Sequence, residues 1–306
     1  MSTQANVISQ SPVSAHAAIS QARRFYWLVR REIWENRSIY LAPLAVAALI
    51  LVASLISSIH LPGKLHVSAL DPVEQHKIIE VPYTFAALLL MFSTIVVGVF
   101  YCLDAFQGER RDRSILFWKS LPVSDRTTVL AKASIPLLVL PLVTFAVTVV
   151  TQAIMLLLGS LRLLASGQSP AMLWTHLSFF QMWGLLLYHL IAAHALWWAP
   201  FWGWLLLVSA WSRRAALLWA TLPLLAISMV ELIAFNTSHF AHLLGYRFLG
   251  EPEGVASAAG NPMAMTSLTS ATPGQYLTSP AFWLGLAMCA AFLAAAVRLR
   301  RYRDPV

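Results

Sequence analysis

The sequence has few charged residues and almost no cysteine. Asp, Glu, Lys and Arg make up 11% of its 306 residues, whereas an ordinary soluble domain carries about a quarter. So few charges cannot cover a water-facing surface, which excludes an ordinary soluble fold. The two cysteines, Cys102 and Cys289, lie in apolar stretches without CxxC or Cys/His metal spacing. We interpret both as small core residues that say nothing about a redox compartment.

Catalytic and nucleotide-binding motifs are also missing. The chain contains no GxxxxGK[ST], no HExxH and no GxSxG. We therefore expect that it is not itself an enzyme and that it binds neither ATP nor a metal or other cofactor. The formal charge of +8 is spread between apolar blocks and forms no single basic patch, which argues against a nucleic-acid partner.

Long apolar blocks are the dominant feature that is present. Hydrophobic residues make up 58% of the chain, and the mean hydropathy is +0.68. Six blocks have about the length that a helix needs to cross a bilayer core. They cover residues 39–59, 83–103, 135–158, 179–210, 216–236 and 280–298. The sequence therefore predicts an all-α integral membrane protein with six transmembrane helices.

The basic residues predict the orientation of these helices. All but four of the 21 Lys and Arg residues lie before the first block, after the second, after the fourth or after the last. The exceptions are Lys64, Lys77, Arg162 and Arg247. Because cytosolic loops collect positive charge, both termini are expected in the cytosol. Residues 1–22 lack the pattern of a cleaved signal peptide and are expected to form a disordered cytosolic tail.

The fourth block, residues 179–210, is longer than one span needs and carries no charge. Two spans would require a tight hairpin near His194 to Pro200, and they would place the basic tail outside. One long, tilted helix bent at Pro200 agrees better with the charge distribution.

Residues 23–37 precede the first block and form an amphipathic pattern. On a helical wheel, arginines and tryptophans share one side, and Glu32 and Asn36 interrupt the apolar side. Such a helix is expected to lie in the cytosolic headgroup region near anionic lipids. The residues assigned to it are Arg23, Arg24, Trp27, Arg30, Arg31 and Trp34. Alternatively, the arginines only fix the orientation of the first span.

The loop at 105–132, between the second and third blocks, reads AFQGERRDRSILFWKSLPVSDRTTVLAK. Charges of both signs precede an apolar island at 115–118 that is too short to cross a membrane. Pro122 then breaks the helix, and Ser124 or Asp125 can cap the next one. The pattern predicts a short amphipathic helix that docks in a groove of a partner protein. Alternatively, the island lies half-buried in the headgroup layer.

The stretch ERRDRSILFWKSLPVSDRTTVLAK resembles the coupling region of ABC-2 type permeases, and the segment at 23–37 resembles that family's interfacial elbow helix. The resemblance implies a type V exporter-like architecture over residues 23–306, in the bacterial inner membrane. It also implies a dimer with a second copy or paralogue, and a separate ATP-binding subunit that carries ATP and magnesium. The docking residues that it implies are Arg110, Arg111, Asp112, Arg113, Ile115, Leu116, Phe117, Trp118, Lys119 and Pro122.

Three ionisable side chains inside the blocks are further candidates, because such groups are costly in a membrane. Glu231 is expected either to line a substrate path or pair with a histidine of the fourth block, or else to be an interfacial carboxylate near Asn236. His189 and His194 are five residues apart, so they cannot share a metal as an i, i+4 pair does. We expect both to be packed and hydrogen-bonded.

Two other functions remain open from the sequence. One is a membrane scaffold or sensor subunit that transports nothing. The other is an intramembrane enzyme that uses Glu231 with His189 or His194. The outer loop at 237–279 is broken by glycine and proline, and the resemblance implies a short re-entrant helix at 239–250.

Overall fold

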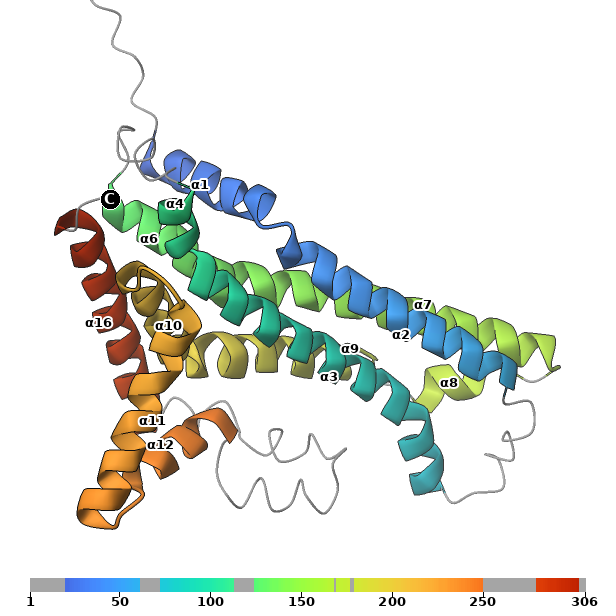
Figure 1. Cartoon of the computed structure of the whole chain (residues 1–306). Helices are drawn as coiled ribbons and strands as arrows, with labels where there is room; N and C mark the ends of the chain where they lie inside the picture. Colours follow the sequence, from blue (N-terminus) through green and yellow to red (C-terminus); the bar gives the residue numbers. More distant parts are fainter. Residues whose placement is uncertain are drawn as a thin grey trace, which may run out of the picture.

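The computed structural model describes residues 20–60, 72–112, 124–167, 169–176, 179–249 and 279–302, and in these ranges the regular elements are helices (Figure 1). Most of the N-terminal tail, residues 113–123 of the loop after the second span, and residues 250–278 of the outer loop lie outside the described residues. The tail, the docking helix and the greater part of the outer loop therefore stay predictions.

Six helical stretches in the described ranges are long and apolar enough to cross a membrane, which confirms the all-α membrane protein and the six predicted blocks. They are α2 (Ser38–His60), α3 (Pro72–Asp104), η2 with α7 (Ile135–Val139 and Leu140–Ala165), α9 with η3 (Phe179–His189 and Leu190–Trp197), α11 (Ala216–Phe235) and α16 (Pro280–Tyr302). The two η segments are π-helical and continue their neighbours without a loop.

Shorter helices accompany the spans. They are α1 (Gln21–Glu35), α4 (Gln107–Arg111), α6 (Asp125–Ser134), α8 (Ala171–His176), α10 (Ala199–Trp211) and α12 (His239–Leu249). Ser124 caps α6 as predicted, because its Oγ accepts a hydrogen bond from the Thr127 N–H at 3.2 Å. From α6 to the end of α7 the chain is one helical stretch of 41 residues, about 60 Å at 1.5 Å per residue.

The spans pack in two groups that share α3. Helices α2, α3 and α7 run side by side, and α10 packs along α16 and against α3 (Figure 1). Gly203 permits the α10–α16 contact, since a Cβ there would lie 3.3 Å from the Cα and carbonyl oxygen of Cys289. Cys102 and Cys289 are free and buried, as small core residues should be. Gln152 of α7 joins three helices by donating to the Tyr83 carbonyl and accepting from Trp183 Nε1.

The fourth block bends earlier than the sequence predicted. The helical path breaks at Trp198, and Pro200 lies in the first turn of α10, where its missing N–H costs no helical hydrogen bond. Helix α10 then packs on α16 and α3. The block therefore gives one span-length helix, Phe179–Trp197, and one shorter apolar helix.

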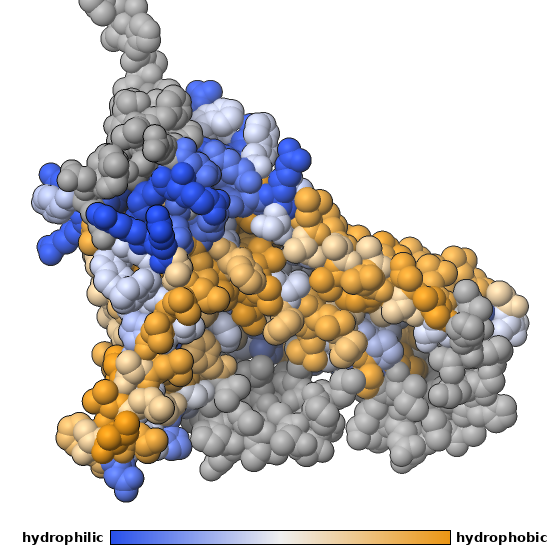
Figure 2. All heavy atoms as spheres, in the orientation of Figure 1, coloured by the Kyte–Doolittle hydropathy of each residue, from blue (hydrophilic) through white to orange (hydrophobic). Residues whose placement is uncertain are grey.

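The surface divides into an apolar body and a hydrophilic cap. Leu49, Phe92 and Ile233 are 69%, 64% and 80% exposed, on three different spans, as expected of side chains that face lipid. Hydrophilic residues gather at one end, over α1, α4, α6 and the end of α16 (Figure 2). The two described basic residues of the predicted outer segments, Arg162 and Arg247, lie at the end of α7 and in α12.

Candidate functional site

The candidate site lies in the hydrophilic cap, where the described chain stops at Asp112 and resumes at Ser124. Helix α4 ends next to Asp112, before residues 113–123, and α6 begins after Ser124, on the other side of these residues. Side chains from α1, α4, α6 and α16 meet between these two points. We call the five charged residues that meet there the ion network. They are Glu32, Glu109, Asp125, Lys132 and Arg300.

Glu32 and Lys132 form the half of the ion network that holds α1. Lys132 Nζ lies 2.9 Å from Glu32 Oε1, and the side chains are each only 3% exposed. Tyr101 of α3 donates its hydroxyl to Glu32 Oε2 at 2.9 Å. Both carboxylate oxygens are thus bonded in a buried place, which is the condition under which a buried charge is tolerated. The amphipathic helix is thereby fixed to the second and third spans.

Glu109 and Arg300, with Asp125, form the other half, and the two acidic residues flank the 113–123 segment in the sequence. Arg300 Nη1 donates to Glu109 Oε2 at 2.8 Å, and Arg300 Nε donates to Asp125 Oδ1 at 3.0 Å. Glu109 precedes the segment and Asp125 follows it, so one guanidinium of the last span joins its two flanks. Lys132 Nζ, at 3.2 Å from Glu109 Oε1, connects the two halves.

An aromatic ring supports the two central cations. Lys132 Nζ and Arg300 Cζ lie 5.5 Å and 5.7 Å from the centroid of the Phe106 ring. Arg31 Nη2 lies 3.6 Å from Glu109 Oε1, so a third cation reaches the same carboxylate. The arrangement alternates acidic and basic groups, which satisfies each charge through a neighbour on another helix.

Arg110 does not lie on the rim of a docking surface as predicted. Its guanidinium turns inward and donates to the backbone carbonyls of Ser209, Ala210 and Ser212, the last at 2.6 Å. These carbonyls end α10, where a helix leaves acceptors without a partner and carries a partial negative charge. Arg110 is therefore the C-terminal cap of α10.

The other predicted docking residues divide between exposed and undescribed positions. The Arg111 side chain is 69% exposed, with Asp104 and Asp112 within 3.7 Å and 3.4 Å of its guanidinium. The remaining docking residues, Arg113, Ile115, Leu116, Phe117, Trp118, Lys119 and Pro122, lie outside the described residues.

The predicted elbow residues divide between two faces of α1. Arg31 is turned toward the ion network, where it also pairs with Glu35 at 2.7 Å. Arg23, Trp27 and Trp34 are exposed. The sequence grouped all the arginines on one side, whereas the structure uses Arg31 and Glu32 to attach the helix.

Glu231 caps a turn. Its carboxylate accepts hydrogen bonds from the N–H groups of His239 and Phe240 at 2.7 Å and 2.8 Å, and from the Thr237 hydroxyl at 3.0 Å. These donors begin α12, so the carboxylate neutralises the N-terminal end of that helix. Within the described residues its hydrogen bonds go to this turn rather than to a histidine of the fourth block. This geometry favours the structural role.

His194 lies beside a proline-interrupted stretch of the third span. In η2 the Leu140 N–H bonds to the Ile135 carbonyl, five residues back, and the next donor in this register would be Pro141, which has none. The Pro136 carbonyl has no donor in this register, and the ring of His194 in η3 lies near it. The Nδ1 atom of His189 lies 2.8 Å from the Leu185 carbonyl of its own helix. Both histidines are buried, as predicted, and His189 is hydrogen-bonded within its own helix.

Two charged residues in the sequence pointed to the ion network, but the sequence pattern could not identify their partners. Glu32 interrupts the apolar side of α1, and Lys132 stands directly before an apolar block. A charge in either place is costly unless a partner meets it. In the described part of the chain, no group of three or more His, Cys, Asp or Glu side chains is arranged to hold a metal ion. Comparison with known protein families, curated proteins and solved structures finds no match to this chain.

Proposed function

We propose that this chain is the membrane-embedded permease subunit of an ATP-driven exporter of the ABC-2 type. In this proposal both termini are in the cytosol of a bacterium, and the protein dimerises in the inner membrane. A separate ATP-binding subunit, with its ATP and magnesium, docks on the 105–132 loop. The text of the 105–132 loop and the six spans support this function.

The observation that carries the proposal is the position of Arg300. It bonds Glu109 before the 113–123 segment and Asp125 after it, at 2.8 Å and 3.0 Å. A force on the segment would therefore act on both flanks together, because neither can move without breaking an ion pair to the buried Arg300.

The ion network provides paths for such a force into the membrane. Asp125 begins the 41-residue helical stretch that contains the third span, and Glu109 lies just after the second. Lys132 forms an ion pair with Glu32 and so connects α1, and Arg300 belongs to the sixth span. Docking at one short loop would in this way move three spans and the amphipathic helix as a unit.

Removal of the apolar anchors of the loop tests the proposal. The tagged chain is co-expressed with an ABC ATP-binding subunit encoded beside its gene, and the co-purified subunit is quantified. We expect Phe117→Ala with Trp118→Ala to reduce it roughly tenfold or more, because aromatic anchors dominate interface energies. Membrane insertion and monodisperse elution should be retained.

A matched control removes the same two residue types elsewhere. Trp174 of α8 and Phe180 at the start of α9 are 56% and 88% exposed, and Trp174→Ala with Phe180→Ala should leave co-purification unchanged. If the loop variant keeps the ATP-binding subunit, and nucleotide turnover remains unaffected, the proposal fails. If docking needs the loop but ATP drives no efflux in reconstituted vesicles, the chain is a scaffold.

A further inference from the structure

The outer face of α1 carries a stripe of alternating arginine and tryptophan. Arg23, Trp27, Arg30 and Trp34 are spaced four, three and four residues apart, so they share one narrow face of the helix. Trp27 is 49% exposed and Trp34 is 66% exposed. The Arg30 guanidinium lies 5.1 Å from the Trp27 ring and 4.6 Å from the Trp34 ring. We call these four residues the Arg–Trp stripe.

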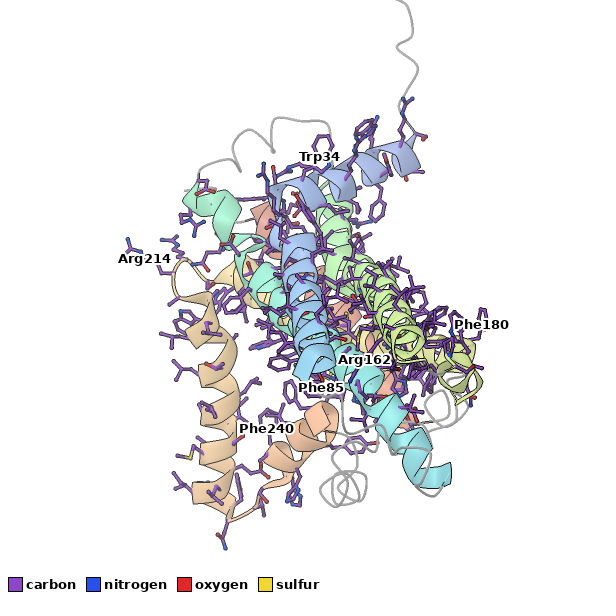
Figure 3. All side chains as sticks on the ribbon, turned by 90° about the vertical axis from the view of Figure 1, so that its right-hand side faces the viewer. Trp34, Phe85, Arg162, Phe180, Arg214 and Phe240 are labelled. Atoms are coloured by element: carbon purple, nitrogen blue, oxygen red, sulfur yellow. The ribbon has the colours of Figure 1, made fainter. Side chains whose placement is uncertain are left out.

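The Arg–Trp stripe faces away from the protein, because the opposite face of α1 is packed against the protein. Glu32 follows Arg23 by nine residues, which places it on the other side of the helix, and there it is bound by Lys132 and Tyr101. Val29 and Ile33 pack against the buried core. Figure 3 shows α1 lying across one end of the bundle, with Trp34 on the face turned away from it.

The stripe has a positive charge that α1 itself does not neutralise. The two carboxylates of this helix are occupied elsewhere, Glu32 in the ion network and Glu35 with Arg31 at 2.7 Å. Stacking on indole rings stabilises a guanidinium and leaves its N–H edge facing outward. That edge matches the geometry of a phosphate group.

The position of α1, next to the start of the first span, favours a lipid as the source of that phosphate. Helix α1 leads directly into α2, whose exposed apolar side chains begin at Leu41 and Leu44. The stripe therefore lies beside the point where the chain enters the hydrocarbon. Tryptophan concentrates in the headgroup layer, and basic residues there are attracted to anionic lipids.

We infer that the Arg–Trp stripe binds the phosphate of anionic phospholipids in the headgroup layer and so holds α1, and with it Glu32, against the ion network. This inference does not depend on ATP-driven export, because the ligand is the membrane itself. Within the exporter proposed above, it would make the charge of the membrane a condition for coupling.

The experiment measures lipid retention by the full-length chain. Phosphatidylglycerol and phosphatidylcholine are added in equal amounts to the detergent-purified protein, and bound lipids are counted by native mass spectrometry. We expect the wild type to retain phosphatidylglycerol preferentially. Arg23→Gln with Arg30→Gln should lower this retention roughly tenfold, in line with the electrostatic contribution of two arginines near a membrane surface.

The control removes two exposed arginines from the corner between α10 and α11. Arg213→Gln with Arg214→Gln changes the net charge equally and should keep retention within about twofold of wild type. If the two variants lose phosphatidylglycerol equally, the stripe is not a site. Elution in phosphatidylcholine nanodiscs checks folding, and Arg30→Gln alone replaces the double variant if that variant fails to fold.

Two further outcomes would overturn the inference. If excess inorganic phosphate displaces phosphatidylglycerol, the stripe binds phosphate in general rather than lipid. If the stripe variant retains phosphatidylglycerol but loses a co-purifying protein, the stripe is a protein-docking face. Failure of the ATP-binding subunit to co-purify would bear on the proposed function alone.

Discussion

Glu32 and Lys132 are one hundred residues apart in the chain, yet their charged groups meet at 2.9 Å in a place where each side chain is only 3% exposed. One belongs to an amphipathic helix and the other to the entrance of the third span. A buried pair of this kind is costly to break, because either partner alone would be an uncompensated charge.

Lys132→Met is expected to destabilise the protein strongly. It leaves Glu32 without its cation and removes one cation from Glu109, so the free energy of unfolding should fall by about 3–5 kcal/mol. Unfolding by SDS in mixed micelles measures this. Arg126→Met, at an exposed position of the same helix, is the control and should change stability by less than about 0.5 kcal/mol.

The same pair predicts a partial rescue. When Glu32→Gln is added to Lys132→Met, the orphaned carboxylate disappears, and about 1 kcal/mol or more of the loss should return. Losses that simply add would show that the two residues do not interact.

Gly98→Ala is expected to disturb the contact between α3 and α10. A Cβ there would lie 2.9 Å from the Trp202 ring, which is buried and fixed by a hydrogen bond from its Nε1 to the His194 carbonyl. The cost should be about 1–3 kcal/mol. Gly184→Ala, with open space around it, should be neutral or stabilising by up to about 1 kcal/mol. Equal melting temperatures for the two variants would contradict this packing.

Ala215→Gly is expected to stabilise the start of α11. Ala215 has φ 53° and ψ 50°, a left-handed conformation that costs an L-residue roughly 1 kcal/mol and costs glycine almost nothing. We expect a gain of about 0.5–1 kcal/mol. Ala226→Gly, inside the same helix, should lose a similar amount. The reverse order of the two melting temperatures would argue against the left-handed junction.

Glu231→Gln is expected to loosen α12 locally. The amide can no longer offer two charged oxygens to the N–H groups of His239 and Phe240, so hydrogen exchange at these two positions should accelerate. The global melting temperature should change little. Loss of transport without faster exchange would instead place Glu231 in a substrate path.

The spans were predictable because each one is an apolar block of nearly the right length, a signal that depends only on local composition. The predicted starts at 39, 216 and 280 are within one residue of the helices. Helix α3 begins eleven residues before its predicted block, at Pro72, because a helix that continues beyond the hydrocarbon carries polar residues. Pro200 was misread as an internal kink because a proline in the first turn of a helix looks the same in sequence.

The site was less predictable, because its contacts join distant parts of the chain. Periodicity placed Glu32 on the apolar side of α1 but could not say which cation meets it there. Arg110 was expected to face outward, whereas three carbonyls about one hundred residues further along the chain turn it inward. Such pairings follow from tertiary packing, which no local pattern encodes.

The ion network also limits how this protein can evolve. Its five charged groups come from four helices, and each acidic group is balanced by a basic one from a different helix. A lineage that lost one of these charges would need a compensating change at a position far away in the sequence. Among homologous sequences, positions 32, 109, 125, 132 and 300 should therefore vary together or not at all, while the lipid-facing positions between them drift freely.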